Sequence, residues 1–407
     1  MAMKRRIAVM MSLDQPYKHH INTFSGICDY AKAHDHWELI TNDWADQMLP
    51  TRAGEPSPYD GLIGRITSLG ARRAKRLGVP VVNVHFNSPA KGLPGVFSDT
   101  AETGRLEAEH LLARGFRDLA FLDHALDRGT IEHGDAFDQA ALDAGCNPPH
   151  RMTLSASKQG RMGIDDLSWS DHRQWNRVMK LIGRWMDQWR VPTGVCIYDL
   201  SIARLVIEKC GLRGWRIPED IAIISGWNDE GVCLKPEPSI TSIAFANEKI
   251  GYEAARMLDE LIDEKENPTI KGKKKPRTIF LPPVGIVARQ STDFFAVDDL
   301  VVRKALGYMD QNLHRPIIIE DIAEYADVSR VTLTTRFREK LGRSVTAEMQ
   351  RLRVERVKRE LTGTGKPVYK IAQSVGYSDA RSLKPVFRKW AGCTPAEFRK
   401  QAEVAKQ

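Results

Sequence analysis

The sequence predicts a two-lobed α/β domain built on parallel sheets, followed by an all-α domain with two helix-turn-helix units. Three observations predict this architecture. Short apolar runs alternate with helical stretches over residues 5–290, one helix-turn-helix pattern occurs twice in the last hundred residues, and the net positive charge is confined to that last part. A chain of 407 residues is long enough for two or three domains with sizeable cores.

The front part of the chain alternates predicted strands with predicted helices. Strands are expected over 6–11, 61–64, 79–84, 119–122, 194–198, 221–225 and 278–283, and helices over 21–33, 101–114, 171–189 and 247–264. Strands separated by helices of ten or more residues indicate parallel sheets that are covered on both faces. Nearly 290 residues of this pattern are long for one core, so two lobes are expected.

The last hundred residues contain one pattern twice, over 322–342 and 371–392. Each copy begins with an Ile-Ala pair, passes through a short turn to a serine, continues with a leucine and a phenylalanine four residues apart, and ends at a glycine. The leucines, phenylalanines and glycines of the two copies lie 50 residues apart, with one extra residue after Ser378 in the second. A repeat that matches in apolar positions, turn and stop signal indicates two copies of one structural unit.

Each copy has the features of a helix-turn-helix. Ser329 and Ser378 are the expected N-caps of the second helices, and the Leu-Phe pairs anchor those helices to a core. The opposite face carries hydroxyls and cations that suit base edges and phosphates in a major groove. Its expected members are Arg330, Val331, Thr332, Thr334, Thr335, Arg336 and Arg338 in the first copy and Arg381, Ser382, Lys384 and Arg388 in the second. The alternative is a pair of solvated helical hairpins.

Charge favours the DNA-binding interpretation. Residues 298–407 hold 22 Lys and Arg against 14 Asp and Glu, a net charge of +8. The whole chain has the same net charge of +8, so residues 1–297 are neutral overall. A basic domain beside a neutral one is typical of a phosphate-binding surface. An unstructured cationic tail would give the same charge without the periodic apolar positions.

Residues 298–404 resemble the DNA-binding domain of the AraC/XylS class of transcription activators. The resemblance rests on the blocks 329–337, 351–356, 371–377 and 392–399. It implies double-stranded operator DNA and RNA polymerase as partners, and helix-turn-helix units at about 320–341 and 370–391 in adjacent major grooves. A joining helix over 347–361 would span roughly 21 Å, which suits two grooves one helical turn apart.

Thr335 and Pro385 depart from the family pattern. A proline within a helix costs about 3 kcal/mol or kinks the helix.

The front part resembles the periplasmic-binding-protein-like sensor of lactose-repressor-type regulators. The matching blocks are 97–117, 216–226, 238–243 and 281–292. A sensor of this kind ahead of an AraC-type domain resembles bacterial activators of xylose operons. The resemblance implies an effector-binding domain over 1–290, a linker over 291–297 and a DNA-binding domain over 298–407. It also implies a homodimer that responds to a small sugar, with D-xylose the first choice and another pentose or sugar derivative open.

A ligand of such a fold binds between the lobes, against loops that follow strand carboxyl ends. Carboxylates and amides bind sugar hydroxyls, and aromatic faces pack against C–H groups. The candidates are Asp14, Tyr17, Asp123, Arg128, Asp199, Trp227, Asn228 and Asp229. We favour Asp199 and Asp229 first. The alternative for each is a helix N-cap, which aspartate supplies routinely at strand–helix junctions.

Other function classes find little support. There is no apolar stretch of eighteen residues for a membrane span and no signal-peptide pattern, and six scattered cysteines suit a reducing cytoplasm. Neither His19-His20 nor Glu132-His133 has a spaced third ligand or a nucleophile, and no phosphate loop is present, so we expect no metal, cofactor or catalytic role. The rivals are a sugar-processing enzyme with a DNA tether, and a DNA-binding regulator whose front domain senses a non-sugar ligand or only dimerises. The lysine-rich run 271–275 is expected to be a solvated loop, with a DNA contact as the alternative.

Overall fold

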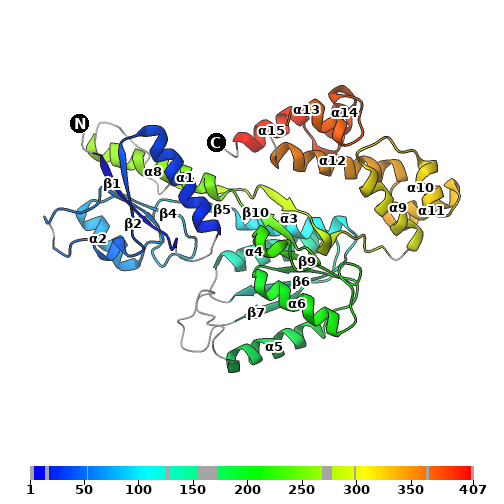
Figure 1. The fold of residues 1–407 in the computed structure, drawn as a ribbon, viewed down its shortest axis with the longest axis horizontal. Coiled ribbons are helices and arrows are strands. Elements are labelled where there is room, and N and C mark those ends of the chain that lie inside the picture. The colour runs from blue at the N-terminus through cyan, green and yellow to red at the C-terminus, as the bar shows by residue number, and fades with distance from the viewer. Residues whose placement is uncertain are drawn as a thin grey trace. The chain divides into compact units, whose positions relative to one another are not determined.

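The computed structural model describes residues 4–13, 18–52, 54–124, 128–154, 172–267, 277–297, 299–363 and 366–404 (Figure 1). The chain forms two compact units. The first consists of Met1–Thr100, Asp127–Gly129 and Phe245–Pro283, and the second of Ala101–Leu126, Thr130–Ala244 and Val284–Gln407. No helix in the described part of the chain is long and apolar enough to cross a membrane. The candidates Asp14 and Tyr17, and the lysine-rich run, lie outside the described residues.

The first unit is a parallel sheet with helices on both faces. Its strands are β1 (Arg5–Met10), β2 (Trp37–Thr41), β3 (Gly61–Gly64), β4 (Val81–Asn83), β5 (Gly95–Ser98) and β11 (Thr278–Leu281), in the order β11-β5-β4-β3-β1-β2. Helices α1 (Lys18–His34) and α8 (Asn247–Glu266) cover one face, and α2 (Ser68–Leu77) with η1 (Ala45–Gln47) covers the other. Gly26 lets α1 approach α8, since a Cβ there would meet the Glu248 carbonyl oxygen at 1.7 Å.

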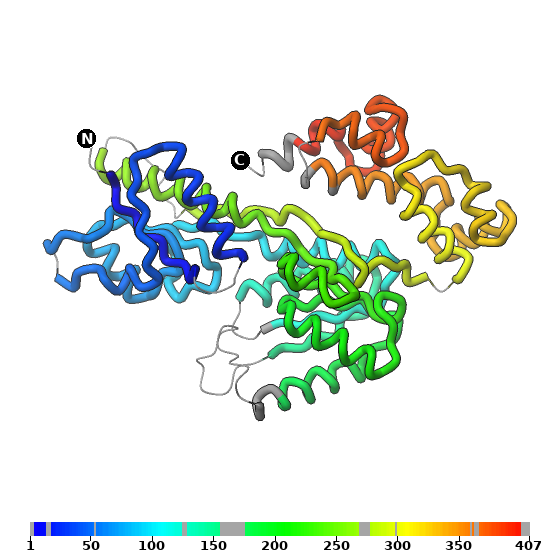
Figure 2. The backbone as a smooth tube through the Cα atoms, in the orientation of Figure 1, coloured from blue at the N-terminus to red at the C-terminus, as the bar shows by residue number. Residues whose placement is uncertain are grey.

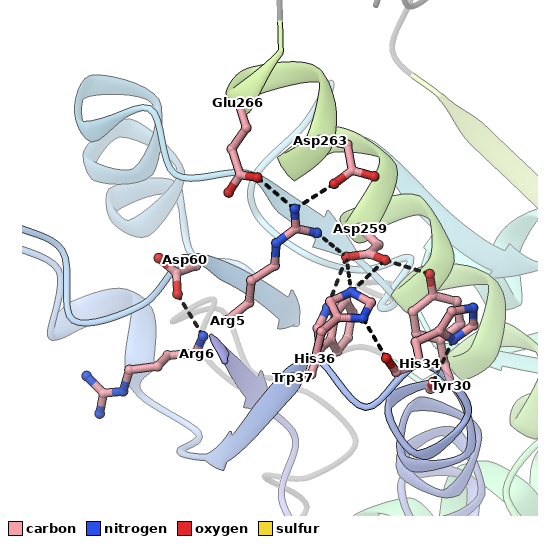
Figure 3. Close-up of polar contacts among 10 residues, drawn as sticks. All are labelled: Arg5, Arg6, Tyr30, His34, His36, Trp37, Asp60, Asp259, Asp263 and Glu266. Atoms are coloured by element: carbon pink, nitrogen blue, oxygen red, sulfur yellow. Dashed lines mark hydrogen bonds and ion pairs between the residues drawn. The ribbon is translucent and has the colours of Figure 1, made fainter. Parts of the chain in front are cut away.

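A buried carboxylate fastens α8 to the start of this unit (Figure 3). Asp259 accepts hydrogen bonds from Arg5 Nη1 at 2.6 Å, Tyr30 Oη at 2.8 Å and Trp37 Nε1 at 3.0 Å, and pairs with His36 Nε2 at 2.9 Å. Burial alone would raise the pKa of Asp259, but the hydrogen bonds, that from His36 foremost, outweigh it and lower the pKa. The same pairing raises the pKa of His36 against the opposing effect of burial. The network therefore joins β1, α1 and β2 to a helix more than 200 residues away in the chain.

The second unit contains another sheet of the same kind. Its strands are β6 (Asp118–His124), β7 (His150–Leu154), β8 (Thr193–Ile197), β9 (Ile221–Ser225), β10 (Thr241–Ala244) and β12 (Gly285–Val287), in the order β12-β10-β9-β8-β6-β7. Only β12 among these is antiparallel to its neighbour. Helices α3 (Thr100–Ala113) and α4 (Arg128–Asp143) pack on one face, and α5 (His172–Met186) and α6 (Leu200–Leu212) on the other. A short helix α7 (Glu230–Cys233) follows β9.

The C-terminal part of the second unit is helical and has two cores. One holds α9 (Leu300–Asn312), α10 (Ile319–Tyr325) and α11 (Arg330–Leu341), and the other α13 (Val368–Ser374), α14 (Ala380–Ala391) and α15 (Pro395–Val404). The single helix α12 (Val345–Gly363) enters both, with Val345, Met349 and Leu352 in the first core and Val354, Val357 and Leu361 in the second. Figure 2 shows this helix, in orange, leading from the helices α9–α11 to the helices α13–α15.

The predicted fold class is confirmed: two sheets of mainly parallel strands precede a helical domain with two helix-turn-helix units. The joining segment is ordered by contacts. Phe294 and Ala296 pack against the core that contains Phe116, whereas Phe295 and Val297 are buried in the core of α9–α11. The Ala296 amide also donates to the Arg114 carbonyl oxygen at 2.7 Å. Residues of the predicted linker 291–297 therefore contact two cores.

Candidate DNA interface and effector site

The first helix-turn-helix unit has the local structure that its sequence predicts. Asp327 occupies the turn with φ 57°, and the Ser329 hydroxyl caps α11 by accepting from the Thr332 amide at 3.1 Å. Leu333 and Phe337 are fully buried in the core. Gly342 ends the helix with φ 67°, a conformation that glycine adopts without steric cost.

The second helix-turn-helix unit repeats this geometry with one difference. Gly376 stands at the turn position with φ 80°, and Gly392 ends α14 with φ 74°. The predicted cap Ser378 is wrong: Asp379 accepts from the Ser382 amide at 2.8 Å and begins α14. The extra residue after Ser378 moves the cap along the chain by one. The Ser382 amide lowers the pKa of Asp379, which is therefore charged at the helix N-terminus, where a negative charge is favourable.

The outward faces of α11 and α14 carry most of the predicted DNA-contacting side chains. The exposed members are Arg330, Val331, Thr335, Arg338, Arg381, Ser382, Lys384 and Arg388, and the half-buried ones are Thr332, Thr334 and Arg336. Val331 is 75% exposed, which leaves an apolar surface for a thymine methyl group. The faces combine apolar, hydroxyl and cationic groups, as base edges and phosphates require.

Intramolecular partners distinguish the cations on α11. Arg336 Nη1 pairs with the buried Asp299 carboxylate at 3.0 Å, and Asp299 also caps α9. Arg330 Nη1 pairs with Glu320 at 2.6 Å, but both side chains are more than half exposed, so this ion pair is weak. Arg336 is therefore held to its own domain, whereas Arg330 can exchange its partner for a phosphate.

Pro385 lies within α14, which runs without interruption from Ala380 to Ala391. Proline has no N–H, so the hydrogen bond to the Arg381 carbonyl is absent. Pro385 is exposed, and Leu383 and Phe387 beside it are fully buried. Packing of these apolar neighbours therefore holds the helix where its backbone bonding is weakest.

The two helix-turn-helix units also contact each other directly. Arg353 on α12 places its guanidinium 5.4 Å from the Tyr377 ring and donates from Nη2 to the Arg315 carbonyl oxygen at 3.0 Å. Gly376 approaches the same loop so closely that a Cβ would lie 2.8 Å from the Arg315 oxygen. The 19 residues of α12 span about 28 Å, close to the ~34 Å between successive major grooves on one DNA face. These contacts fix the spacing of the two units.

In the sheet of the second compact unit, four effector candidates lie at the carboxyl ends of the adjacent strands β8 and β9. Asp199 caps α6 by accepting from the Ile202 amide at 2.9 Å, and Asp229 caps α7 by accepting from the Gly231 amide at 3.0 Å. Trp227 lies 5.1 Å from the ring of Tyr198, which precedes Asp199. The capping alternative is thus present at both aspartates, and each cap uses only one carboxylate oxygen, Oδ1.

The fourth candidate, Asn228, belongs to a polar network. Its Oδ1 accepts from Arg289 Nη2 at 2.6 Å and from Ser242 Oγ at 3.0 Å. Arg289 Nη1 donates in turn to Ser242 Oγ at 2.7 Å. Because these two bonds hold the Asn228 oxygen, they also fix the direction of its side-chain NH2 group. Sequence reasoning missed Tyr198, Ser242 and Arg289, although Arg289 falls inside one of the family-like blocks.

Arg128 is the first residue of α4 and is grouped with the first compact unit. Its partners there follow β4. Its amide donates to Asn87 Oδ1 at 3.0 Å, and its guanidinium lies 4.5 Å from the centre of the Phe86 ring. Phe86 and Asn87 occupy the carboxyl edge of that sheet and were not predicted. In contrast, Asp123 is buried and pairs with Arg151, which indicates a structural role.

Two domain families match the chain. Residues 108–292 match the periplasmic binding protein-like domain, and residues 322–401 match a helix-turn-helix domain. The periplasmic binding protein-like match therefore precedes the helix-turn-helix match in the chain.

Curated relatives include regulators of a sugar operon. The xylose operon regulatory protein of Escherichia coli strain K12 is 26% identical over 225 residues, which cover 55% of this chain and 56% of the relative. That of Haemophilus influenzae is 24% identical over 228 residues, 56% of this chain and 57% of the relative. The HTH-type transcriptional regulator GntR of Pseudomonas aeruginosa is 30% identical over 205 residues, 49% and 54% of the two chains. The matches thus span little more than half the length of these relatives.

Solved structures share the fold. A xylose-binding transcription activator, xylR, is similar over 98% of both chains with a TM-score of 0.56 at 20% identity. The transcriptional regulator CelR in complex with cellobiose is similar over 72% of this chain and 86% of its own, with a TM-score of 0.53 at 18% identity. At these identities the likeness shows the arrangement of sheets and helices.

Proposed function

We propose that this chain is a sugar-responsive, DNA-binding transcription regulator that activates genes for the catabolism of a xylose-like pentose. The observation that carries the proposal is the pair of helix-turn-helix units, held at a fixed spacing by α12 and Arg353, with basic outward faces. The remainder of the chain is neutral, so the charge is concentrated where phosphates would bind. Such a regulator acts in the cytoplasm, where it reaches DNA and RNA polymerase.

The effector we propose is a small sugar that contacts Asp199, Trp227, Asn228 and Asp229. Two carboxylates whose helix caps use one oxygen each, an oriented amide and an aromatic pair supply the groups that a pyranose requires. The names of the relatives make D-xylose the first choice. The role is one of binding, in which the sugar stabilises one arrangement of a homodimer on its operator.

The second candidate function is DNA binding without sugar sensing, with the front domain responding to a non-sugar ligand or only dimerising. The specific observation in its favour is that Asp199 and Asp229 both cap helices, which accounts for these residues without any ligand. The two candidates make different predictions for the response to sugars, so one experiment separates them.

The experiment is a thermal-shift screen of the full-length protein against pentoses, hexoses and their phosphates. A ligand that binds only the folded state raises the melting temperature in proportion to its affinity and concentration. We expect one sugar to raise it, and Asp229→Asn to abolish that shift while keeping the helix cap. Asp220→Asn, a change of another half-buried aspartate of the second unit, serves as the matched control. No shift with any sugar would contradict the sensor proposal and leave DNA binding untouched.

Dimerisation is tested separately. Sedimentation of the full-length protein with its operator duplex and the effector should give two chains per complex. A single chain under all these conditions would contradict the dimer.

A further inference from the structure

Three metal-ligating side chains meet inside the core of the second unit, on the sheet face covered by α3 and α4. Glu107 comes from α3, His133 from α4 and Cys196 from β8. Their ligand atoms all lie within 4.8 Å of one another. The exposed fractions are 0%, 1% and 0%, so water does not screen these groups. The cluster lies among apolar side chains such as Phe121 and Phe137.

The hydrogen bonds within the cluster leave one charged atom unsatisfied. His133 Nε2 shares a short hydrogen bond with Glu107 Oε2, and the Cys196 thiol donates to the same oxygen at 2.9 Å. Glu107 Oε1 is buried and has no hydrogen-bond partner among the described residues. Burial of a carboxylate oxygen without a partner costs free energy, which a donor or a cation beside it would offset. Among the described residues, therefore, no cation or donor faces Oε1.

We propose that Glu107, His133 and Cys196 bind a divalent transition-metal ion, with Zn²⁺ the best fit. One carboxylate oxygen, one imidazole nitrogen and one thiolate sulfur form a mixed ligand set that Zn²⁺ accepts at about 2.0–2.3 Å, with water in a fourth position. The ion takes the place of the hydrogen bonds that now converge on Oε2, and the water in its fourth position can donate to Oε1.

Binding exchanges a proton for the metal. The Cys196 S–H bond breaks, its electron pair forms the S–Zn bond, and the proton leaves to solvent, while His133 binds through the lone pair of its neutral ring. Burial, and then the neighbouring Glu107 charge, raise the pKa of the Cys196 thiol well above its ordinary value. Because binding releases the thiol proton, the affinity for Zn²⁺ increases with pH.

The surroundings hold the ligands in place. Gly104 allows α3 to approach α4, since a Cβ at this position would lie 2.0 Å from the His133 carbonyl oxygen. The centre of the His133 ring lies 5.1 Å from that of Phe121 and 6.0 Å from that of Tyr198, and both pairs are close to perpendicular. Because Tyr198 contacts Trp227, the ion would lie beneath the loops at the carboxyl ends of β8 and β9 and would stiffen them. The binding of metal does not depend on the proposed function.

The sequence could not reveal this cluster. His133 is adjacent to Glu132, and that pair has no third ligand nearby. The actual neighbour Glu107 is 26 residues from His133 and 89 from Cys196. Only the packing of α3 and α4 on β8 brings the three together.

The test measures metal binding by the full-length protein. Protein stripped with a chelator is dialysed against Zn²⁺ or Co²⁺, its metal content is measured by mass spectrometry, and the Co²⁺ form is examined by absorption spectroscopy. We expect one ion per chain, a thiolate-to-cobalt charge-transfer band, a higher melting temperature with Zn²⁺, and an affinity that increases with pH. Cys196→Ser should lose the band and about 100-fold or more in affinity. Cys146→Ser, a change of a thiol in the same core, should keep both.

Binding below about 0.1 ion per chain, or Co²⁺ bound without a thiolate band, would overturn the proposal and leave a hydrogen-bonded core network. Undiminished binding by Cys196→Ser would overturn it as well. Circular dichroism of each variant establishes that it is folded. Should Cys196→Ser fail to fold, the spectrum of the wild-type Co²⁺ form decides.

Discussion

Replacing Gly376 by alanine perturbs the contact that places the second helix-turn-helix unit against the first. Gly376 has φ 80°, and a Cβ there would lie 2.8 Å from the Arg315 carbonyl oxygen and 2.9 Å from that of Leu313. The left-handed conformation costs alanine about 1 kcal/mol. Overlap with two backbone carbonyls, which cannot rotate away, adds about 1–2 kcal/mol. We expect the free energy of opening α13 and α14 to decrease by about 2–3 kcal/mol.

Hydrogen exchange of the α13 and α14 amides measures this free energy locally. A loss of about 2–3 kcal/mol corresponds to exchange about 30- to 150-fold faster. Asp327 is the equivalent position of the first helix-turn-helix unit and has φ 57°. In the control variant Asp327→Gly, relief of left-handed strain offsets the greater chain entropy of glycine, so exchange in α10 and α11 should change little. Exchange of Gly376→Ala within about threefold of wild type would refute the proposed role of this contact.

Three further predictions concern the helical core, the DNA interface and the first compact unit. Leu383→Ala removes a fully buried side chain and should destabilise the α13–α15 core by about 2–5 kcal/mol in denaturant unfolding; an unchanged midpoint would contradict the packing. Arg388→Ala should weaken binding to every duplex and reduce the slope of log K against log salt by about 1, and an unchanged slope would remove Arg388 from the interface. The pKa of His36 is raised by Asp259, so its stabilisation is complete below its ordinary pKa of about 6.5 and is lost as pH rises through the folded pKa. Wild type should therefore exceed His36→Gln in melting temperature more near pH 6 than near pH 9, and an equal difference at both would contradict the ion pair.

Much of the helical domain was predictable from the sequence because its signals are local. The Leu-Phe spacing, the capping Ser329 and the stop glycines Gly342 and Gly392 each act within one turn of helix. The position of the second cap was missed, since a serine and an aspartate stand side by side and both can accept an amide. The alternation of strands and helices likewise predicted the two sheets, because burial on both faces selects continuous apolar runs.

Contacts between distant residues were not predictable. The sequence predicts that Arg336 faces DNA, but Asp299, 37 residues away in the chain, pairs with it. Arg353 lies on the joining helix α12, but the sequence does not reveal that it contacts both the Tyr377 ring and the Arg315 carbonyl oxygen. A single sequence records neither partner, because each contact depends on how helices pack rather than on spacing along one of them.

The central proposal, that a sugar alters how the paired helix-turn-helix units hold DNA, is tested by operator affinity. The operator is first selected from random duplexes, and the affinity of the full-length protein is then measured with and without D-xylose and other pentoses. We predict that one sugar changes the affinity by about 5- to 150-fold. In Asp229→Asn the sugar-free affinity should be unchanged and the response lost. Equal affinity with every sugar, in a protein that binds its duplex tightly, would contradict the proposal.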